Sequence, residues 1–254
     1  MTNPHPIYAL WSHPRSMSTA MERVMRERGD LDCAHEPFMY DYYVHRQVRQ
    51  MPFFDVQPGH PTAYADIRDM LLARASTQPV FIKDMSYYVW PQLIDDPLIA
   101  PHLINMFLIR DPIASIASYY KLDPDLSLEE IGIEAQWHHY TALCDMGERP
   151  VVIDAHQIRA DPRGVISALW AAVGLPFVGK AFDWQSETPE DWDQVEAWHD
   201  KATSTTGIQP LTDADLQKQR DRFEACATDT PHLRDYLAHH QVFYEKLKAQ
   251  TINP

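Results

Sequence analysis

The sequence predicts an α/β fold with a central, mainly parallel sheet flanked by helices. Short apolar runs that suit buried strands alternate with segments of helical spacing, which is the pattern of βαβ units. The clearest run, HLINMFLIR at residues 102–110, is followed by Asp111 and Pro112, a helix-capping residue and a typical first helical residue. Ligands of such sheets bind at the C-terminal ends of the strands, so residues there are the first candidates for function.

The first half of the chain predicts two strands and two helices. Residues 7–11 (IYALW) predict a buried strand, and residues 19–28 predict a helix that ends at a glycine. Residues 31–60 are rich in aromatic residues and proline, and we expect them to form an excursion over the sheet edge rather than a linker. Residues 65–75 predict a second helix, and residues 79–83 a short strand that ends on a lysine.

The second half continues the alternation. The strand at 102–110 leads into the helical segment IASIASYYKL, and a long helical stretch follows at about 127–146. Residues 150–153 predict another strand, and residues 163–173 another helix, stopped by a glycine and a proline. From about residue 190 the chain is polar and helical. We expect one domain over residues 1–254, with its core at about 7–180 and a helical C-terminal part at about 190–250.

Composition and charge exclude several classes of function. The 254 residues carry a net charge of −14, which disfavours a nucleic-acid partner because phosphate contacts need clustered Lys and Arg. Cys33, Cys144 and Cys226 are far apart and form no CxxC, so we expect a reducing, cytoplasmic location. We expect no signal peptide and no membrane partner, because no apolar run has the length or flanks that either requires.

The loop after the first predicted strand has the layout of an anion site. Arg15, Ser16, Ser18 and Thr19 lie where a strand gives way to a helix, whose N-terminal N–H groups and dipole favour an anion. The signature GxxxxGK[ST] of nucleoside triphosphate sites is absent. The alternative is a serine-rich turn in which Ser18 or Thr19 only caps the helix.

A second candidate anion site is the segment RDPIASIASYYK. Arg110 lies at a strand end, and Ser118 lies seven residues beyond Asp111, close to two helical turns. Asp111, Ser115 and Ser118 therefore share a helix face that can look back at Arg110. An arginine and a serine so placed can hold a second phosphate. The alternative is an Arg–Asp surface pair with solvent-facing serines.

Together these segments resemble the sulfotransferases that use 3′-phosphoadenosine 5′-phosphosulfate (PAPS). The family's loop [KR]-S-G-[TS]-T is matched by RSMST at residues 15–19, except that Met17 replaces the usual glycine. Its R-D-P motif, with a serine eight residues after the arginine, is matched at 110–118, and ADPRGVISALWAAVGLPF (160–177) is similar to a third family segment. The resemblance covers about residues 7–180 and implies a three-layer, P-loop-like α/β fold.

The resemblance also implies roles for these residues. The loop from Arg15 to Thr19, Met17 included, would bind the 5′-phosphosulfate, with Arg15 also near the reacting group. Arg110 and Ser118 would bind the 3′-phosphate. The stretch from Lys201 to Gly207 is either a late loop over the nucleotide or a surface loop.

The general base is the least defined part of the predicted site. Many cytosolic relatives use Lys-x-His, but here Lys83 and Asp84 are followed by Met85, which cannot accept a proton. Some carbohydrate-directed members place a glutamate after the first helix, where this chain has Glu36. We therefore expect Glu36 to be the base, with Asp84 second and His35 third. Lys83 would bind an oxygen of the leaving phosphate. The alternatives are a surface or capping Glu36 and a strand-end Lys83 that only reaches solvent.

The sequence also bears on a metal site and on the acceptor. The pairs His138–His139 and His239–His240 cannot each chelate one ion, because adjacent helical residues diverge by about 100°, so we expect no metal. Aromatic residues expected near the site suit a small aromatic or apolar alcohol or a sugar as acceptor, or else belong to the core. They are Tyr40, Tyr42, Tyr43, Phe53, Phe54, Tyr87, Tyr88 and Trp90.

Three functions therefore stay open at this point. The first is a sulfotransferase that moves a sulfuryl group from PAPS to a hydroxyl or amine of a small acceptor. The second is a non-catalytic protein of the same scaffold that binds a nucleotide or another bis-anion. The third, which the sequence supports least, is a P-loop kinase, because no lysine follows a loop glycine.

Overall fold

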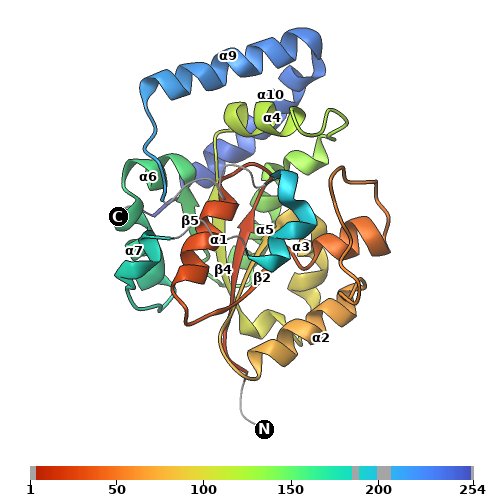
Figure 1. Cartoon of the computed structure of the whole chain (residues 1–254), viewed down its shortest axis with the longest axis vertical. Coiled ribbons are helices and arrows are strands. Elements are labelled where there is room, and N and C mark those ends of the chain that lie inside the picture. The colour runs from red at the N-terminus through yellow and green to blue at the C-terminus, as the bar shows by residue number, and fades with distance from the viewer. Residues whose placement is uncertain (1–3, 185–188, 199–206, 253–254) are drawn as a thin grey trace. The chain divides into compact units, whose positions relative to one another are not determined.

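The protein contains a five-stranded parallel sheet flanked by helices, which confirms the predicted α/β fold (Figure 1). The computed structural model describes residues 4–184, 189–198 and 207–252. The strands pair in the order β2-β3-β1-β4-β5. Their bounds are β1 Ile7–Ser12, β2 Asp32–His35, β3 Val80–Met85, β4 Leu103–Ile109 and β5 Val151–Asp154.

Helix α4 begins where the sequence supplies a cap. The Asp111 carboxylate accepts a hydrogen bond from the Ile113 N–H at 2.9 Å, and Pro112 is the first helical residue of α4. The α-helices are α1 Ser18–Glu27, α2 Tyr64–Ala75, α3 Ser86–Asp95, α4 Pro112–Tyr120, α5 Ile133–Asp145, α6 Ala155–Ala160, α7 Pro162–Ala172, α9 Asp213–Asp229 and α10 His232–Lys248. Shorter turns are η1 Asp41–His45, η2 Ala100–His102, η3 Glu129–Ile131, η4 Gly179–Phe182 and η5 Glu190–Trp198.

Several elements differ from the sequence prediction. The excursion expected over residues 31–60 begins with β2, the edge strand, which pairs in parallel with β3 and places His35 opposite Lys83. Helix α3 was not predicted, because it holds Pro91 and aromatic residues that favour strands. Strand β3 continues to Met85, so Lys83 lies inside the strand, fully buried, rather than at its end.

The chain divides into two compact units. Residues 1–11, 19–106 and 178–207 make the first unit, and residues 12–18, 107–177 and 208–254 make the second. In the first unit the buried Trp11 indole donates to the Asn105 side chain at 2.8 Å. Inside the second, the Tyr244 hydroxyl on α10 donates to Asp154 at the end of β5, also at 2.8 Å. Each unit thus has its own buried polar links between elements.

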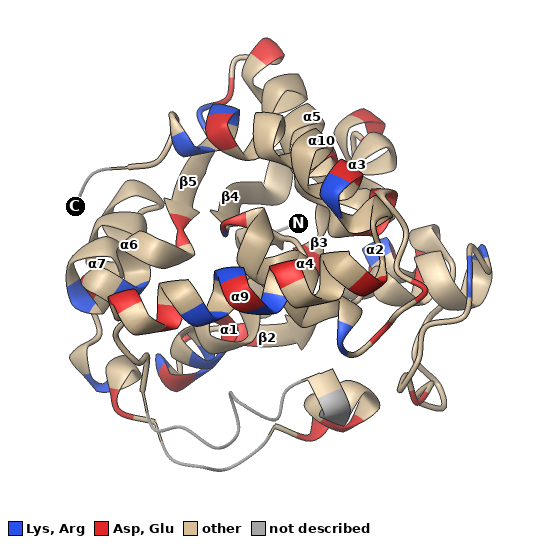
Figure 2. Cartoon of the chain, turned by 90° about the horizontal axis from the view of Figure 1, so that it is seen from above, with Lys and Arg blue, Asp and Glu red and all other residues tan. Residues whose placement is uncertain are grey.

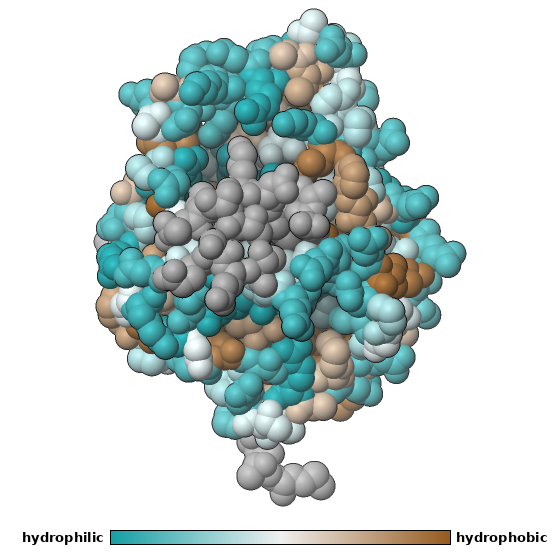
Figure 3. All heavy atoms as spheres, in the orientation of Figure 1, coloured by the Kyte–Doolittle hydropathy of each residue, from teal (hydrophilic) through white to brown (hydrophobic). Residues whose placement is uncertain are grey.

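Helix α9 carries both acidic and basic residues along its length (Figure 2). The face drawn in Figure 3 is largely hydrophilic, with apolar residues in small separate patches. Within the described residues, no helix combines the length and the apolar character needed to span a membrane.

Three buried imidazoles in the second unit make its stability depend on pH. Burial is the main reason that the pKa falls to about 3 for His13 and His139 and to about 4 for His240. These histidines stay neutral in the folded protein, whereas in the unfolded chain they take up protons below about pH 6.5. Their contribution to stability is therefore complete above that pH and is lost as the pH falls towards 4.

We expect the free energy of unfolding to drop from pH 6.5 to 4.5, with each buried histidine contributing up to about 1.4 kcal/mol per pH unit. His139→Leu removes one such group, whose ring packs on Phe107 with 5.2 Å between centroids, and should flatten the slope. His156→Leu, at an exposed position, should leave the slope unchanged. Denaturant titrations at several pH values measure both slopes, and equal slopes for wild type and His139→Leu would contradict this explanation.

Candidate functional site

The loop between β1 and α1 has an unusual backbone. Arg15 and Met17 adopt left-handed conformations, with φ of 62° and 80°, on either side of Ser16. Left-handed residues are typical of loops whose backbone N–H groups bind anions, and in this loop the Ser16 N–H donates to the His13 carbonyl oxygen at 3.2 Å. Ser18, buried, is the first residue of α1, and Thr19 is the second. The loop therefore combines left-handed backbone with a helix N-terminus.

Ser16 adds a second indication of an anion. Its side chain is fully buried, and its hydroxyl oxygen has no hydrogen-bond partner among the described residues. A buried hydroxyl without a partner costs free energy, so it is rarely retained without a reason. An anion held in the loop would supply the missing partner.

The structure brings three predicted residues of the second unit together. The Arg15 side chain donates from Nε to the Ser118 hydroxyl at 3.0 Å. Arg110 donates from Nη1 to the Arg15 carbonyl oxygen at 2.8 Å, and its backbone N–H donates to Nε2 of His13 at 3.1 Å. His13 was not predicted, because a histidine beside a proline in a loop carries no signal of its own.

Cations concentrate around Arg110 although the whole chain is acidic. Burial lowers the pKa of Arg110 to about 10, and the charges of Arg159, Arg15 and Arg222 act in the same direction. The carboxylate of Asp111 opposes them but does not compensate. Three arginines thus disfavour the charge of Arg110, and an anion bound there would relieve that repulsion.

Met17 occupies a backbone conformation that suits glycine. At a φ of 80°, a residue with a side chain raises the free energy of the folded state by about 1–2 kcal/mol relative to right-handed backbone. Glycine has no such penalty. We expect Met17→Gly to be more stable than Met17→Ala by about 0.5–1 kcal/mol, after allowing for glycine's greater freedom when unfolded.

Denaturant unfolding of the two Met17 variants measures this difference. Met146 is a matched control, because it lies at an exposed helix end with a φ of −78°. There alanine should be more stable than glycine, the usual order. The account of Met17 is wrong if alanine is the more stable variant at both positions.

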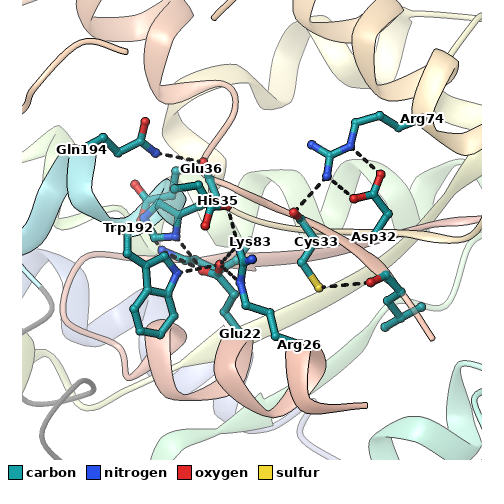
Figure 4. Close-up of polar contacts among 12 residues, drawn as sticks. Glu22, Arg26, Asp32, Cys33, His35, Glu36, Arg74, Lys83, Trp192 and Gln194 are labelled. Carbon is teal, nitrogen blue, oxygen red and sulfur yellow. Dashed lines mark hydrogen bonds and ion pairs between the residues drawn. The ribbon is translucent and has the colours of Figure 1, made fainter. Parts of the chain in front are cut away.

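A buried ionic network lies in the first unit (Figure 4). Lys83 forms an ion pair with Glu36, and its Nζ also lies 3.8 Å from Oε2 of Glu22. His35 contacts Glu22 through Nδ1 at 2.7 Å, and its Nε2 lies 3.9 Å from Oε1 of Glu36. All four side chains are at least nine-tenths buried. Glu36, Lys83 and His35, predicted as candidates from distant segments, thus meet in one cluster.

Glu36 is held in a strained loop. It is left-handed at a φ of 41°, and its N–H donates to the Lys83 carbonyl at 2.9 Å. Asp84 fixes the same loop, because its two oxygens accept the N–H groups of Phe38 and Met85 at 2.8 and 2.9 Å. Burial, and next the charge of Glu36, raise the pKa of Asp84 well above its usual range. These bonds favour a supporting role for Asp84 over that of a base.

Glu22 is the centre of the network and was missed from the sequence. Its Oε1 accepts from Arg26 at 2.7 Å and from the Trp192 indole at 2.9 Å. Burial alone would raise the pKa of Glu22, but His35, Lys83 and Arg26 outweigh it and hold the pKa well below the usual range. Residues 21–25 of α1 are all buried, so a glutamate between apolar Met21 and Val24 was the available signal.

The predicted aromatic wall lies largely inside the first unit. Tyr42, Tyr43, Tyr87 and Tyr88 are buried and pack edge to face or tilted, with ring centroids 4.6–5.6 Å apart. Phe53, in contrast, is 60% exposed. These four tyrosines therefore belong to the core.

The remaining predicted features are placed as follows. The stretch Lys201 to Gly207 lies outside the described residues except for its last member. His239 contacts Glu134 at 2.8 Å, while His139 is buried on α5. Among the residues that the structure describes, no group of three or more His, Cys, Asp or Glu is arranged to hold a metal ion.

Comparison with known proteins gives the same family at the level of sequence. Residues 7–239 match the model of the sulfotransferase domain. The branched-chain-amino-acid aminotransferase-like proteins 2 and 1 of Arabidopsis thaliana are each 26% identical to the chain, over 78% and 82% of its length. These matches cover 35% and 37% of the relatives, so the chain spans about a third of their length.

Two solved structures are also similar. The sulfotransferase domain of the Synechococcus PCC 7002 olefin synthase is 18% identical with a TM-score of 0.46, over 88% of this chain and 96% of that one. A mouse sulfotransferase complexed with PAP (3′-phosphoadenosine 5′-phosphate) is 10% identical with a TM-score of 0.44, over 92% of this chain and 89% of that one.

Proposed function

Because the chain belongs to the sulfotransferase family, we propose that it transfers a sulfuryl group from PAPS to a hydroxyl or amine of a small acceptor. The observation that carries this proposal is the cationic loop site, where Arg15, Arg159 and Arg222 act on Arg110 and the buried Ser16 hydroxyl has no hydrogen-bond partner among the described residues. PAPS carries anions at its 5′ and 3′ positions and so matches a site with an excess of cations.

The residues fit the two anionic ends of PAPS. Ser16 and Ser18 would hold the 5′-phosphosulfate together with N–H groups of the loop from Arg15 to Thr19, other than the Ser16 N–H, which donates to the His13 carbonyl oxygen. The helix N-terminus and the Ser16 hydroxyl supply further donors. Arg110 and Ser118 would hold the 3′-phosphate. Arg15 already joins these two, since it donates to Ser118 and accepts from Arg110.

PAPS supplies a sulfuryl group on a good leaving group, so the protein's part is to position groups and to stabilise charge. Glu36 would accept the proton of the acceptor hydroxyl or amine as its oxygen or nitrogen bonds to sulfur. Lys83 would neutralise the charge that develops on the phosphate oxygen when the bond between that oxygen and sulfur breaks. In the structure these two groups form an ion pair with each other.

Transfer of labelled sulfate from PAPS to a panel of alcohols, phenols, amines and sugars tests this function. We expect at least one class of acceptor to become labelled, with 3′-phosphoadenosine 5′-phosphate (PAP) as the second product. If PAP binds but no acceptor class is labelled, the chain is a nucleotide-binding protein on this scaffold and the proposed transfer is wrong.

A further inference from the structure

His35 lies between the two buried carboxylates of the first unit (Figure 4). Its Nδ1 is 2.7 Å from Oε2 of Glu22, and its Nε2 is 3.9 Å from Oε1 of Glu36. Lys83 spans the same two carboxylates, paired with Glu36 and 3.8 Å from Glu22. The imidazole and the ammonium are therefore two alternative cations for Glu36.

Glu22 fixes the orientation of the imidazole. An ionised carboxylate only accepts hydrogen bonds, so Nδ1 of His35 must carry the proton that it donates to Glu22. In the neutral ring, Nε2 then has the lone pair, on the side where Glu36 lies. Arg26 and Trp192 hold Glu22 itself at 2.7 and 2.9 Å. The ring is thus oriented as a base towards Glu36.

We propose that His35, oriented by Glu22, receives at Nε2 the proton that Glu36 takes from the acceptor. This inference rests on the proposed sulfuryl transfer. His35 acts through Glu36 rather than on the substrate, so it is a positioning and proton-storing residue.

The network has one more carboxylate than it has cations when the imidazole is neutral. With a neutral imidazole, the carboxylates of Glu22, Glu36 and Asp191 share the two cations Lys83 and Arg26. When Lys83 turns to the phosphate, Glu36 loses its nearest cation. An imidazolium between Glu22 and Glu36 replaces that charge. The charged groups around the ring are Glu22 and Arg26 on α1, Glu36 after β2, Lys83 on β3 and Asp191 on η5. Asp84 on β3 is a further titratable group, and burial and the charge of Glu36 raise its pKa.

The proton balance is simple. As the acceptor oxygen bonds to sulfur, its proton moves to a Glu36 oxygen, and from there to Nε2 of His35. Glu36 is again a carboxylate, His35 is an imidazolium paired with Glu22, and the phosphate leaves as an anion beside Lys83. Release of PAP returns Lys83 to Glu36, and the imidazolium gives its proton to water.

This sequence predicts a measurable proton uptake without any acceptor. When PAP binds to the free protein, Lys83 turns to the phosphate, as it does after transfer. Glu36 then loses its cation, so His35 should take a proton from solvent. Calorimetry of PAP binding in buffers of different ionisation enthalpy counts the protons taken up by the complex. The measurement is made at about pH 7.5, where a histidine in water is mostly neutral. We expect wild type to take up protons, and His35→Asn and Glu22→Gln to lose that uptake.

The controls separate this inference from the proposed function. His156→Asn, at an exposed position, should retain the wild-type uptake. Protons that PAP itself gains or loses on binding are the same for every variant, so they cancel when the proton uptake of two variants is compared. If PAP binds and His35→Asn takes up as many protons as wild type, the inference is wrong and the proposed function stands. If PAP fails to bind wild type, both are wrong.

A second measurement avoids any loss of folding in the variants. NMR of wild-type protein labelled at the imidazole carbons, with His35 assigned from the variant spectra, reports the charge of each ring directly. The His35 signal should move from the neutral to the imidazolium position when PAP is added. A signal that stays at the neutral position in the PAP complex overturns the inference.

Discussion

Replacing Arg110 by alanine is expected to weaken PAP binding by about 10²–10³-fold, because truncating a buried charged partner costs about 2–5 kcal/mol. Arg110 is half-buried near other arginines, and its Nη1 donates to the Arg15 carbonyl oxygen at 2.8 Å. The variant therefore loses the proposed 3′-phosphate ligand and a support of the loop at once. Calorimetry with PAP measures the loss.

Two further variants sharpen the Arg110 test. Arg110→Lys keeps the charge but not the planar fork, so it should recover only part of the affinity. Arg149→Ala removes an exposed arginine of the same unit and should bind PAP like wild type. A change of less than about threefold in Arg110→Ala, below 1 kcal/mol, would contradict the assignment of Arg110.

The second large effect is expected at the proposed base. Glu36→Gln should lower kcat by about 10²–10⁴-fold while leaving PAP affinity nearly intact, since the amide cannot accept the proton. The variant should still fold, because Gln can accept a hydrogen bond from Lys83 and the Glu22 carboxylate stays 3.8 Å from that lysine. Steady-state rates with an acceptor found in the labelling panel measure the change.

Controls for Glu36→Gln distinguish the base from its supports. Glu129→Gln, at an exposed position, should have the wild-type rate. Asp84→Asn should reduce stability more than it reduces kcat, because both Asp84 oxygens hold backbone N–H groups. An unchanged kcat in Glu36→Gln, with a large loss in Asp84→Asn, would transfer the role of base to Asp84.

The extent to which the fold follows from the sequence depends on the element. Strands β1 and β4 were predicted because apolar runs are strong local signals, and α4 because Asp111 and Pro112 mark its start. Strand β2 has only four residues, DCAH, and is a strand because β3 pairs with it, which is not a local property. Helix α3 forms against its local propensity, which tertiary packing overrides.

The same distinction applies to the site. Arg110 was predicted from its place at the end of a strand, and Ser118 from its spacing of two helical turns after Asp111. In the structure both form hydrogen bonds with Arg15. Glu22 and His13 could not be found this way. Their roles depend on burial and on partners such as Trp192, which is 170 residues away from Glu22 in the chain. Local spacing carries no information about such contacts.

The most direct test of the proposed function compares PAP with ADP, which lacks the 3′-phosphate. Calorimetry on the wild-type protein should show PAP binding at least about tenfold more tightly, since hydrogen bonds to a charged group contribute about 1.5–3 kcal/mol. Arg110→Ala should bring the two affinities close together. Equal binding of PAP and ADP by the wild-type protein would contradict a 3′-phosphate site, and with it the use of PAPS.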